Sequence, residues 1–129
     1  MTAWTFRFPP VFIDELRRHS NQITAAERQV SRAQYPQIRM REQALADFLD
    51  AIKAVRNAEF PPALLKPVKS ESGRFLASIF VLEVEPYRAY YHVDVARQFC
   101  IGLYVADGPL THADIARLVA PRNKRDKHR

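Results

Sequence analysis

Apolar and polar positions divide the N-terminal part of the chain into segments of different period. Trp4 to Phe8 alternates apolar and polar residues, which predicts a half-buried strand. Two prolines end that strand and can open a helix, which we expect to run through Arg18. Thr24 and Glu27 have the spacing of a capping box, so the sequence predicts that a second helix begins there.

A longer helix is predicted over residues 38–57. Its apolar positions form one stripe at helical spacing, made of Leu45, Phe48, Leu49, Ile52 and Val55. Pro61 and Pro62 close this helix, and we expect residues 63–73 to form a loop.

Three strands are predicted in quick succession after that loop, over Phe75 to Glu85, Arg88 to Asp94 and Phe99 to Val105. The middle strand alternates cleanly, so Arg88, Tyr90 and His92 are expected on one face and Ala89, Tyr91 and Val93 on the other. Short connections between the strands favour an antiparallel meander.

A last helix is expected to open at Thr111, with Asp114 as its capping partner, and to end at Pro121. Leu110 and Ile115 stand at the positions of a hydrophobic staple. The fold class predicted from this order is α+β, with an antiparallel sheet of about four strands packed on the N-terminal helices. We expect one domain over residues 1–120 and a basic tail over residues 121–129.

Composition places the positive charge mostly in that tail. The formal net charge is +6, and the last nine residues alone carry five basic groups and one acid.

The single cysteine, Cys100, rules out an intrachain disulfide framework, and the scattered histidines predict no metal site. Three glycines form no phosphate-binding loop, so no nucleotide cofactor is expected. Neither a segment of bilayer length nor a signal peptide is apparent, which predicts a cytoplasmic protein without a membrane partner.

One stretch of the predicted meander carries a resemblance. Tyr87-Arg88-Ala89-Tyr90-Tyr91-His92-Val93-Asp94, together with the order of elements, resembles the RelE/ParE/HigB superfamily of bacterial toxins. That family has a first strand, a helical hairpin, a loop with lysines and a Tyr-Arg-x-x-Tyr-x-x-Asp pattern in the meander. Lys66 and Lys69 occupy the loop here. The resemblance therefore implies a RelE/ParE-like fold.

The same resemblance implies a function and its partners. We expect the toxin of a type II toxin–antitoxin system, a ribosome-dependent endoribonuclease that binds and cleaves messenger RNA and so inhibits translation. A cognate antitoxin and the ribosome would be its partners. Two alternatives stay open: a ParE-like gyrase inhibitor, and a non-catalytic module of this fold that binds nucleic acid or protein.

Cleavage of RNA requires a deprotonated 2′-hydroxyl, a neutralised phosphate and a protonated leaving oxygen. The catalytic candidates are Arg74 for the phosphate, Glu83 as a general base and His112, which lies where ribonuclease members place a catalytic His or Tyr. Those members commonly carry an Arg where Glu83 and Glu85 stand, and a basic residue where Ala106-Asp107-Gly108 follows the last strand. Such acids oppose RNA unless one of them acts as the base.

Further basic and aromatic residues are candidates for binding RNA or phosphate, with ring stacking on Tyr90 and charge from its neighbours. They are Lys66, Lys69, Arg88, Tyr90, His92, Arg122, Lys124 and Arg125. The lysines, Arg88 and the tail residues have structural alternatives: solvated loop lysines, an Arg88 bonded to the hairpin and helix, and a solubilising tail.

Overall fold

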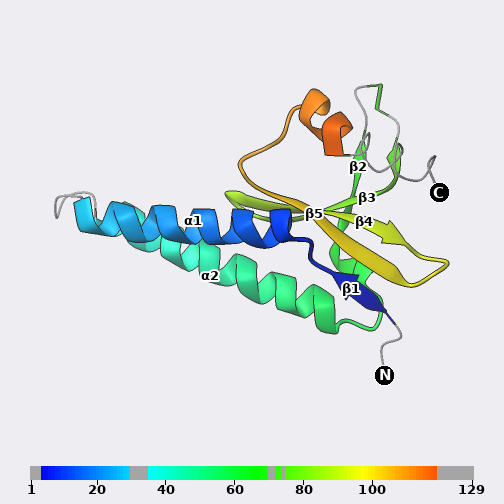
Figure 1. Cartoon of the computed structure of the whole chain (residues 1–129), viewed down its shortest axis with the longest axis horizontal. Helices are drawn as coiled ribbons and strands as arrows, with labels where there is room; N and C mark the ends of the chain where they lie inside the picture. The colour runs from blue at the N-terminus through cyan, green and yellow to red at the C-terminus, as the bar shows by residue number, and fades with distance from the viewer. Residues whose placement is uncertain (1–3, 30–34, 70–71, 74, 119–129) are drawn as a thin grey trace.

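The computed structural model describes residues 4–29, 35–69, 72–73 and 75–118 of the chain (Figure 1). In chain order its elements are β1 (Thr5–Arg7), α1 (Pro10–Gln29), α2 (Tyr35–Asn57), the 3-10 helix η2 (Pro61–Leu64), β2 (Lys66–Lys69), β3 (Phe75–Val84), β4 (Tyr87–Asp94) and β5 (Phe99–Asp107). A short helical segment over residues 112–118 follows β5. The predicted basic tail lies outside the described ranges. No helix within those ranges is long and apolar enough to cross a membrane.

One five-stranded sheet organises the fold, in the order β1-β5-β4-β3-β2. Strands β2 to β5 pair antiparallel in sequence order, whereas β1 pairs in parallel with β5 at one edge. The helices α1 and α2 form a long hairpin that lies on one face of the sheet and extends past it (Figure 1). The predicted α+β class and the antiparallel meander are thereby confirmed.

The strand β2 corrects the prediction of a loop over residues 63–73. Lys66 is the Cα partner of Val81, and Val68 is buried against the sheet. The segment has one β-branched residue, one proline and two lysines, a composition that strand patterns do not recognise. Proline and lysine are nevertheless tolerated on an edge strand, where they discourage pairing with other chains. The sheet therefore has one strand more than the sequence predicts.

The helix α1 is continuous, so the predicted capping box at Thr24 is wrong. Thr24 lies inside the helix, and its Oγ1 donates a hydrogen bond to the carbonyl oxygen of Ser20 at 3.2 Å. The apolar stripe that begins at Phe12 continues to Ile23, which is buried. No glycine or proline interrupts the chain between Arg18 and Thr24, so the first helix has no reason to end there.

The helix α2 begins three residues earlier than the predicted residue 38. Pro36 falls in its first turn, where the missing N–H would have no intrahelical acceptor. Four of the five predicted stripe residues are buried, and Leu49 is exposed. The buried side of the helix consists of Ile38, Leu45, Phe48, Ile52 and Val55.

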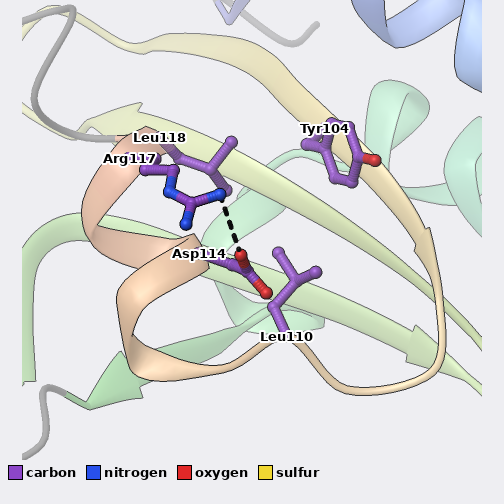
Figure 2. A pocket seen from close by; sticks show the side chains of 5 residues that line it. All are labelled: Tyr104, Leu110, Asp114, Arg117 and Leu118. Carbon is purple, nitrogen blue, oxygen red and sulfur yellow. Dashed lines mark ion pairs between the residues drawn. The ribbon is translucent and has the colours of Figure 1, made fainter.

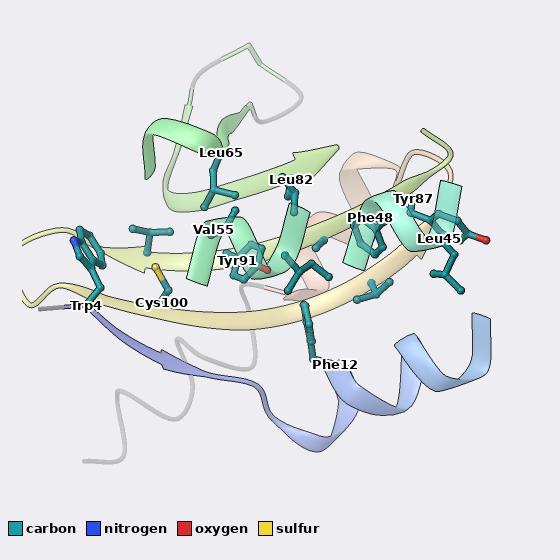
Figure 3. Close-up of a cluster of buried hydrophobic side chains, with 14 of the residues drawn as sticks. Trp4, Phe12, Leu45, Phe48, Val55, Leu65, Leu82, Tyr87, Tyr91 and Cys100 are labelled. Atoms are coloured by element: carbon teal, nitrogen blue, oxygen red, sulfur yellow. The ribbon is translucent and has the colours of Figure 1, made fainter. Parts of the chain in front are cut away.

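The inner core fills the space between the helical hairpin and the sheet (Figure 3). Its labelled members are Trp4, Phe12, Leu45, Phe48, Val55, Leu65, Leu82, Tyr87, Tyr91 and Cys100. Phe12 packs closely on β5, where a Cβ built on Gly102 would lie 2.6 Å from Phe12 Cδ2. Since carbon atoms prefer separations of about 3.5–4.0 Å, only glycine fits under this ring. The approach of α1 to the sheet thus depends on Gly102.

The outer core covers part of the opposite face of the sheet. The helical segment over residues 112–118 packs there through Ile115 and Leu118, and Leu110 contributes from the connection before it. Its predicted start is confirmed. The amide of Asp114 donates to Thr111 Oγ1 at 3.1 Å, and the amide of Thr111 donates to Asp114 Oδ2 at 3.4 Å. This reciprocal cap fixes the direction in which the helix leaves β5.

Candidate functional site

The outer face of β4 carries the polar side chains that the alternation predicts. Arg88 is paired with Glu83 of β3, Tyr90 with Val81, and His92 with Ile79. Directly opposed residues of an antiparallel pair lie on the same face of the sheet, so β3 and β4 together form one continuous outer face.

Three charged residues from three different strands meet at one end of this face. Lys66 Nζ of β2 lies 3.6 Å from Glu83 Oε2 of β3. Glu83 is the register partner of Arg88 of β4. We call Lys66, Glu83 and Arg88, together with Glu85 beside Arg88, the outer-face cluster. The sheet register therefore places Glu83 between the strands of Lys66 and Arg88, with its carboxylate in contact with Lys66.

Arg88 is held by the hairpin between β3 and β4. Its Nη2 lies 2.5 Å from Glu85 Oε1, and its Nη1 donates to the carbonyl oxygen of Pro86 at 3.5 Å. The Arg88 side chain is only 14% exposed, whereas that of Glu85 is 70% exposed. Arg88 is thus bonded to the hairpin, which is the structural role predicted as the alternative to RNA binding. Each cation of the cluster has a carboxylate beside it.

Tyr90 lies two residues along β4 from Arg88 and is not on the surface. It is 4% exposed and belongs to the outer core. Burial raises the pKa of its hydroxyl, whereas a hydrogen bond with the backbone of Leu110 and the charge of Arg88 lower it. The ring is covered by neighbouring side chains, which corrects the prediction that a base stacks on it. Tyr90 instead joins β4 to the connection that leads into the last helix.

The other predicted site residues lie away from the outer-face cluster or are not described. Lys69 and His92 lie toward the far end of β2 and β4, away from Glu83 and Arg88. His112 is exposed, and it is the first residue of the helical segment after the capping Thr111. Four predicted residues, namely Arg74, Arg122, Lys124 and Arg125, lie outside the described residues.

A cavity of about 300 Å³ opens between β5 and the last helical segment (Figure 2). It is lined by Tyr104, Leu110, Asp114, Arg117 and Leu118. Arg117 Nη1 lies 3.5 Å from Asp114 Oδ1, and this ion pair borders the cavity. The side chain of Arg117 is 80% exposed, so most of its donors face solvent.

Sequence reasoning missed this cavity, although its parts were visible. Asp114 was identified only as a capping residue, and Arg117 lies one helical turn beyond it. The missing signal is the tertiary contact. Tyr104 is the Cα partner of Tyr90, and Leu110 meets the same Tyr90 through its backbone. The cavity is therefore adjacent to the strand that bears Arg88.

The chemistry available on this face is acid–base and anion-binding chemistry. The carboxylate of Glu83 can act as a proton acceptor, and the cations of Lys66 and Arg88 can contact a phosphate. Within residues 4–29, 35–69, 72–73 and 75–118, no three His, Cys, Asp or Glu side chains are grouped so as to hold a metal ion.

Comparison with solved structures finds a likeness of fold. The sequence matches no family model and no curated protein. The fold is similar to a chain of the toxin–antitoxin complex RelBE2 from Mycobacterium tuberculosis, with 19% identity and a TM-score of 0.47. The match covers 83% of this chain and 93% of that chain. At this identity and this TM-score, the likeness carries no argument about activity.

Proposed function

We propose that this protein is the toxin of a type II toxin–antitoxin system and that it cleaves messenger RNA on the ribosome. The observation that carries this proposal is the outer-face cluster, in which Glu83 lies between Lys66 and Arg88 on adjacent strands. A carboxylate between two cations is suited to a phosphodiester, because the cations bind the phosphate and the carboxylate takes the proton of the neighbouring hydroxyl.

The proposed reaction assigns one role to each candidate group. Glu83 removes the proton from the ribose 2′-hydroxyl, and the 2′-oxygen attacks the adjacent phosphorus. The bond from phosphorus to the 5′-oxygen of the next nucleotide breaks, and His112 donates a proton to that leaving oxygen. The products are a 2′,3′-cyclic phosphate and a 5′-hydroxyl. Lys66 and Arg88 neutralise the charge that develops on the phosphate, and Arg74 is proposed to assist them.

Arg88 can contact a phosphate while it keeps its present partners. In the structure its guanidinium contacts Glu85 and the carbonyl oxygen of Pro86. A guanidinium has five N–H donors, so a phosphate can bind through those that remain. The bond to Pro86 also holds the guanidinium in place before RNA arrives, which lowers the entropic cost of binding.

The proposed partner in the resting state is a cognate antitoxin. The motif Tyr87-Arg88-x-x-Tyr91-x-x-Asp94 and the order of elements support membership of the RelE/ParE/HigB superfamily, whose toxins are held by co-expressed antitoxins. Purification of the chain together with the product of the adjacent reading frame tests this part of the proposal.

A second candidate function is inhibition of gyrase without nuclease chemistry. One observation favours it: Glu83 and Glu85 each neutralise one cation of the outer-face cluster. A protein whose cations are already compensated binds an RNA phosphate less strongly, because the acids repel it.

Induced expression in bacterial cells separates these functions. The nuclease proposal predicts growth arrest with new 5′-hydroxyl ends in ribosome-bound messenger, and Glu83→Gln should abolish both. Glu42→Gln removes the same charge from an exposed position on α2 and should leave both intact. Arrest without cuts but with trapped gyrase complexes would favour the second candidate. Absence of arrest would contradict both and favour a non-catalytic binding module.

A further inference from the structure

The cavity between β5 and the last helical segment has the size and lining of a site for a small flat ligand. Its volume of about 300 Å³ lies at the lower end of the range of small-molecule sites. Leu110, Leu118 and the ring of Tyr104 form apolar walls, and Arg117 with Asp114 forms one polar side (Figure 2). A ligand that fits this lining has apolar faces and one edge rich in hydrogen-bond acceptors.

Arg117 determines which acceptors are recognised. A guanidinium offers only donors, in a planar arrangement that matches two acceptors side by side. Asp114 contacts Arg117 through Oδ1, while its Oδ2 accepts the bond from the Thr111 amide in the helix cap. The cap thus fixes the carboxylate, and the carboxylate in turn holds the guanidinium at the edge of the cavity, with its remaining donors accessible.

Among nucleobases this arrangement favours guanine. Guanine presents O6 and N7 as adjacent acceptors, and a bidentate contact from arginine to this edge is the commonest specific contact to a base. Adenine presents a donor, the N6 amino group, beside N7, so one of the arginine donors would be left without an acceptor.

The position of the cavity relates it to the outer-face cluster. Tyr104 is the Cα partner of Tyr90, and Arg88 precedes Tyr90 by two residues, about 7 Å along the strand. Adjacent strands are about 4.8 Å apart. These spacings are on the scale of one extended nucleotide, so an RNA whose phosphate contacts Arg88 can bring a neighbouring base to the cavity.

We infer that this cavity binds a guanine base of single-stranded RNA, with Arg117 donating to O6 and N7 and Asp114 positioning Arg117. The inference rests on the proposed function, because it assigns a base preference to the same RNA-binding face. It makes Arg117 a specificity-determining residue that lies apart from the proposed acid–base chemistry of Glu83.

Binding of mononucleotides to the full-length chain tests the inference without depending on cleavage. Guanosine 5′-monophosphate should shift the NMR methyl signals of Leu110 and Leu118 and bind about tenfold more tightly than adenosine 5′-monophosphate, as expected for a bidentate contact. Arg117→Ala should remove this preference. Arg117→Lys should remove it as well, because a lysine keeps the charge but not the bidentate geometry.

Arg97→Ala is a matched control, because Arg97 forms an exposed ion pair with Asp94 at the same spacing in sequence. This variant should keep the preference for guanosine. Equal binding of both nucleotides by the wild type, or an unchanged preference in both Arg117 variants, would overturn the inference.

The two proposals fail in different ways. A guanosine preference that depends on Arg117, in a protein that causes no cuts in cells, would retain the cavity assignment and remove the nuclease. Cuts that depend on Glu83 but show the same neighbouring bases in wild type and Arg117→Ala would retain the nuclease and remove the cavity assignment.

Discussion

Replacement of Glu85 by glutamine tests whether Arg88 binds a phosphate. Glu85 Oε1 lies 2.5 Å from Arg88 Nη2, so its charge opposes any anion that approaches the guanidinium. Glutamine keeps an oxygen that can accept from Arg88 and removes only the charge. We therefore expect Glu85→Gln to bind RNA more tightly, which is the opposite of what loss of an ion pair does in most contexts.

The magnitude follows from Coulomb's law. Across about 6 Å, a unit charge repels a phosphate by about 0.7 kcal/mol in water and about 2.8 kcal/mol at an effective dielectric constant of 20. The Glu85 side chain is 70% exposed, so the lower value applies, and it corresponds to about a threefold gain in affinity. One more uncompensated cation at the phosphate should also steepen the dependence of log K on log salt by about 0.7.

Fluorescence anisotropy with a labelled 2′-O-methyl oligonucleotide, which cannot be cleaved, measures both quantities. Asp94→Asn is the matched control, because Asp94 pairs with Arg97 at the same sequence spacing but at the far end of β4. It should leave affinity and salt slope close to those of the wild type. The reasoning would be refuted if Glu85→Gln and the control changed binding equally, since the effect would then be one of net charge.

Three further predictions concern the scaffold. Gly102→Ala should lower the free energy of unfolding by about 1–3 kcal/mol, because the added Cβ would overlap Phe12. Thermal unfolding followed by circular dichroism measures this loss. An unchanged midpoint of unfolding would contradict it. Thr111→Ala should lower the free energy of unfolding in urea by about 1 kcal/mol through loss of the helix cap, whereas Thr24→Ala should lower it less. The reverse order would support the capping box predicted at Thr24. Burial raises the pKa of the Cys100 thiol from 9.0 to about 11, so its contribution to stability is complete below about pH 9 and is lost as the pH rises toward 11. Unfolding by urea across that range should show a smaller loss of stability in Cys100→Ala than in the wild type, and equal losses would contradict the assignment.

The parts of the fold that the sequence predicted are those with strong local signals. The alternation from Arg88 to Asp94 placed Tyr90 and Tyr91 on opposite faces, and the structure confirms this, with Tyr91 in the inner core and Tyr90 in the outer core. The cap formed by Thr111 and Asp114 was predictable because both partners lie within four residues. Local periods and caps need no knowledge of the tertiary structure.

The errors arose where tertiary contacts outweigh local signals. Val68 is buried in the outer core, so β2 forms although its composition resembles a loop. Thr24 and Glu27 have the spacing of a cap, yet burial of Ile23 continues the helix through them.

The candidate site could be predicted only in part. The residue types of the outer-face cluster were visible in the sequence, but not the register that places Glu83 opposite Arg88 and beside Lys66. The ion pair of Lys66 with Glu83 depends on that register, whereas Glu85 contacts Arg88 within the hairpin. The cavity was missed altogether, because Tyr104 and Arg117 come together only when the last helix folds back on β5.

The central claim is that the outer-face cluster cleaves RNA through the carboxylate of Glu83. Mapping of 5′-hydroxyl ends in ribosome-bound messenger, in cells that express the wild type or Glu83→Gln at equal levels of folded protein, tests it most directly. The account predicts cuts within translated codons for the wild type and a loss of about 10²–10⁴-fold for the variant, the range expected for removal of a general base. Cuts of equal frequency with the two proteins, or no cuts with either, would contradict it.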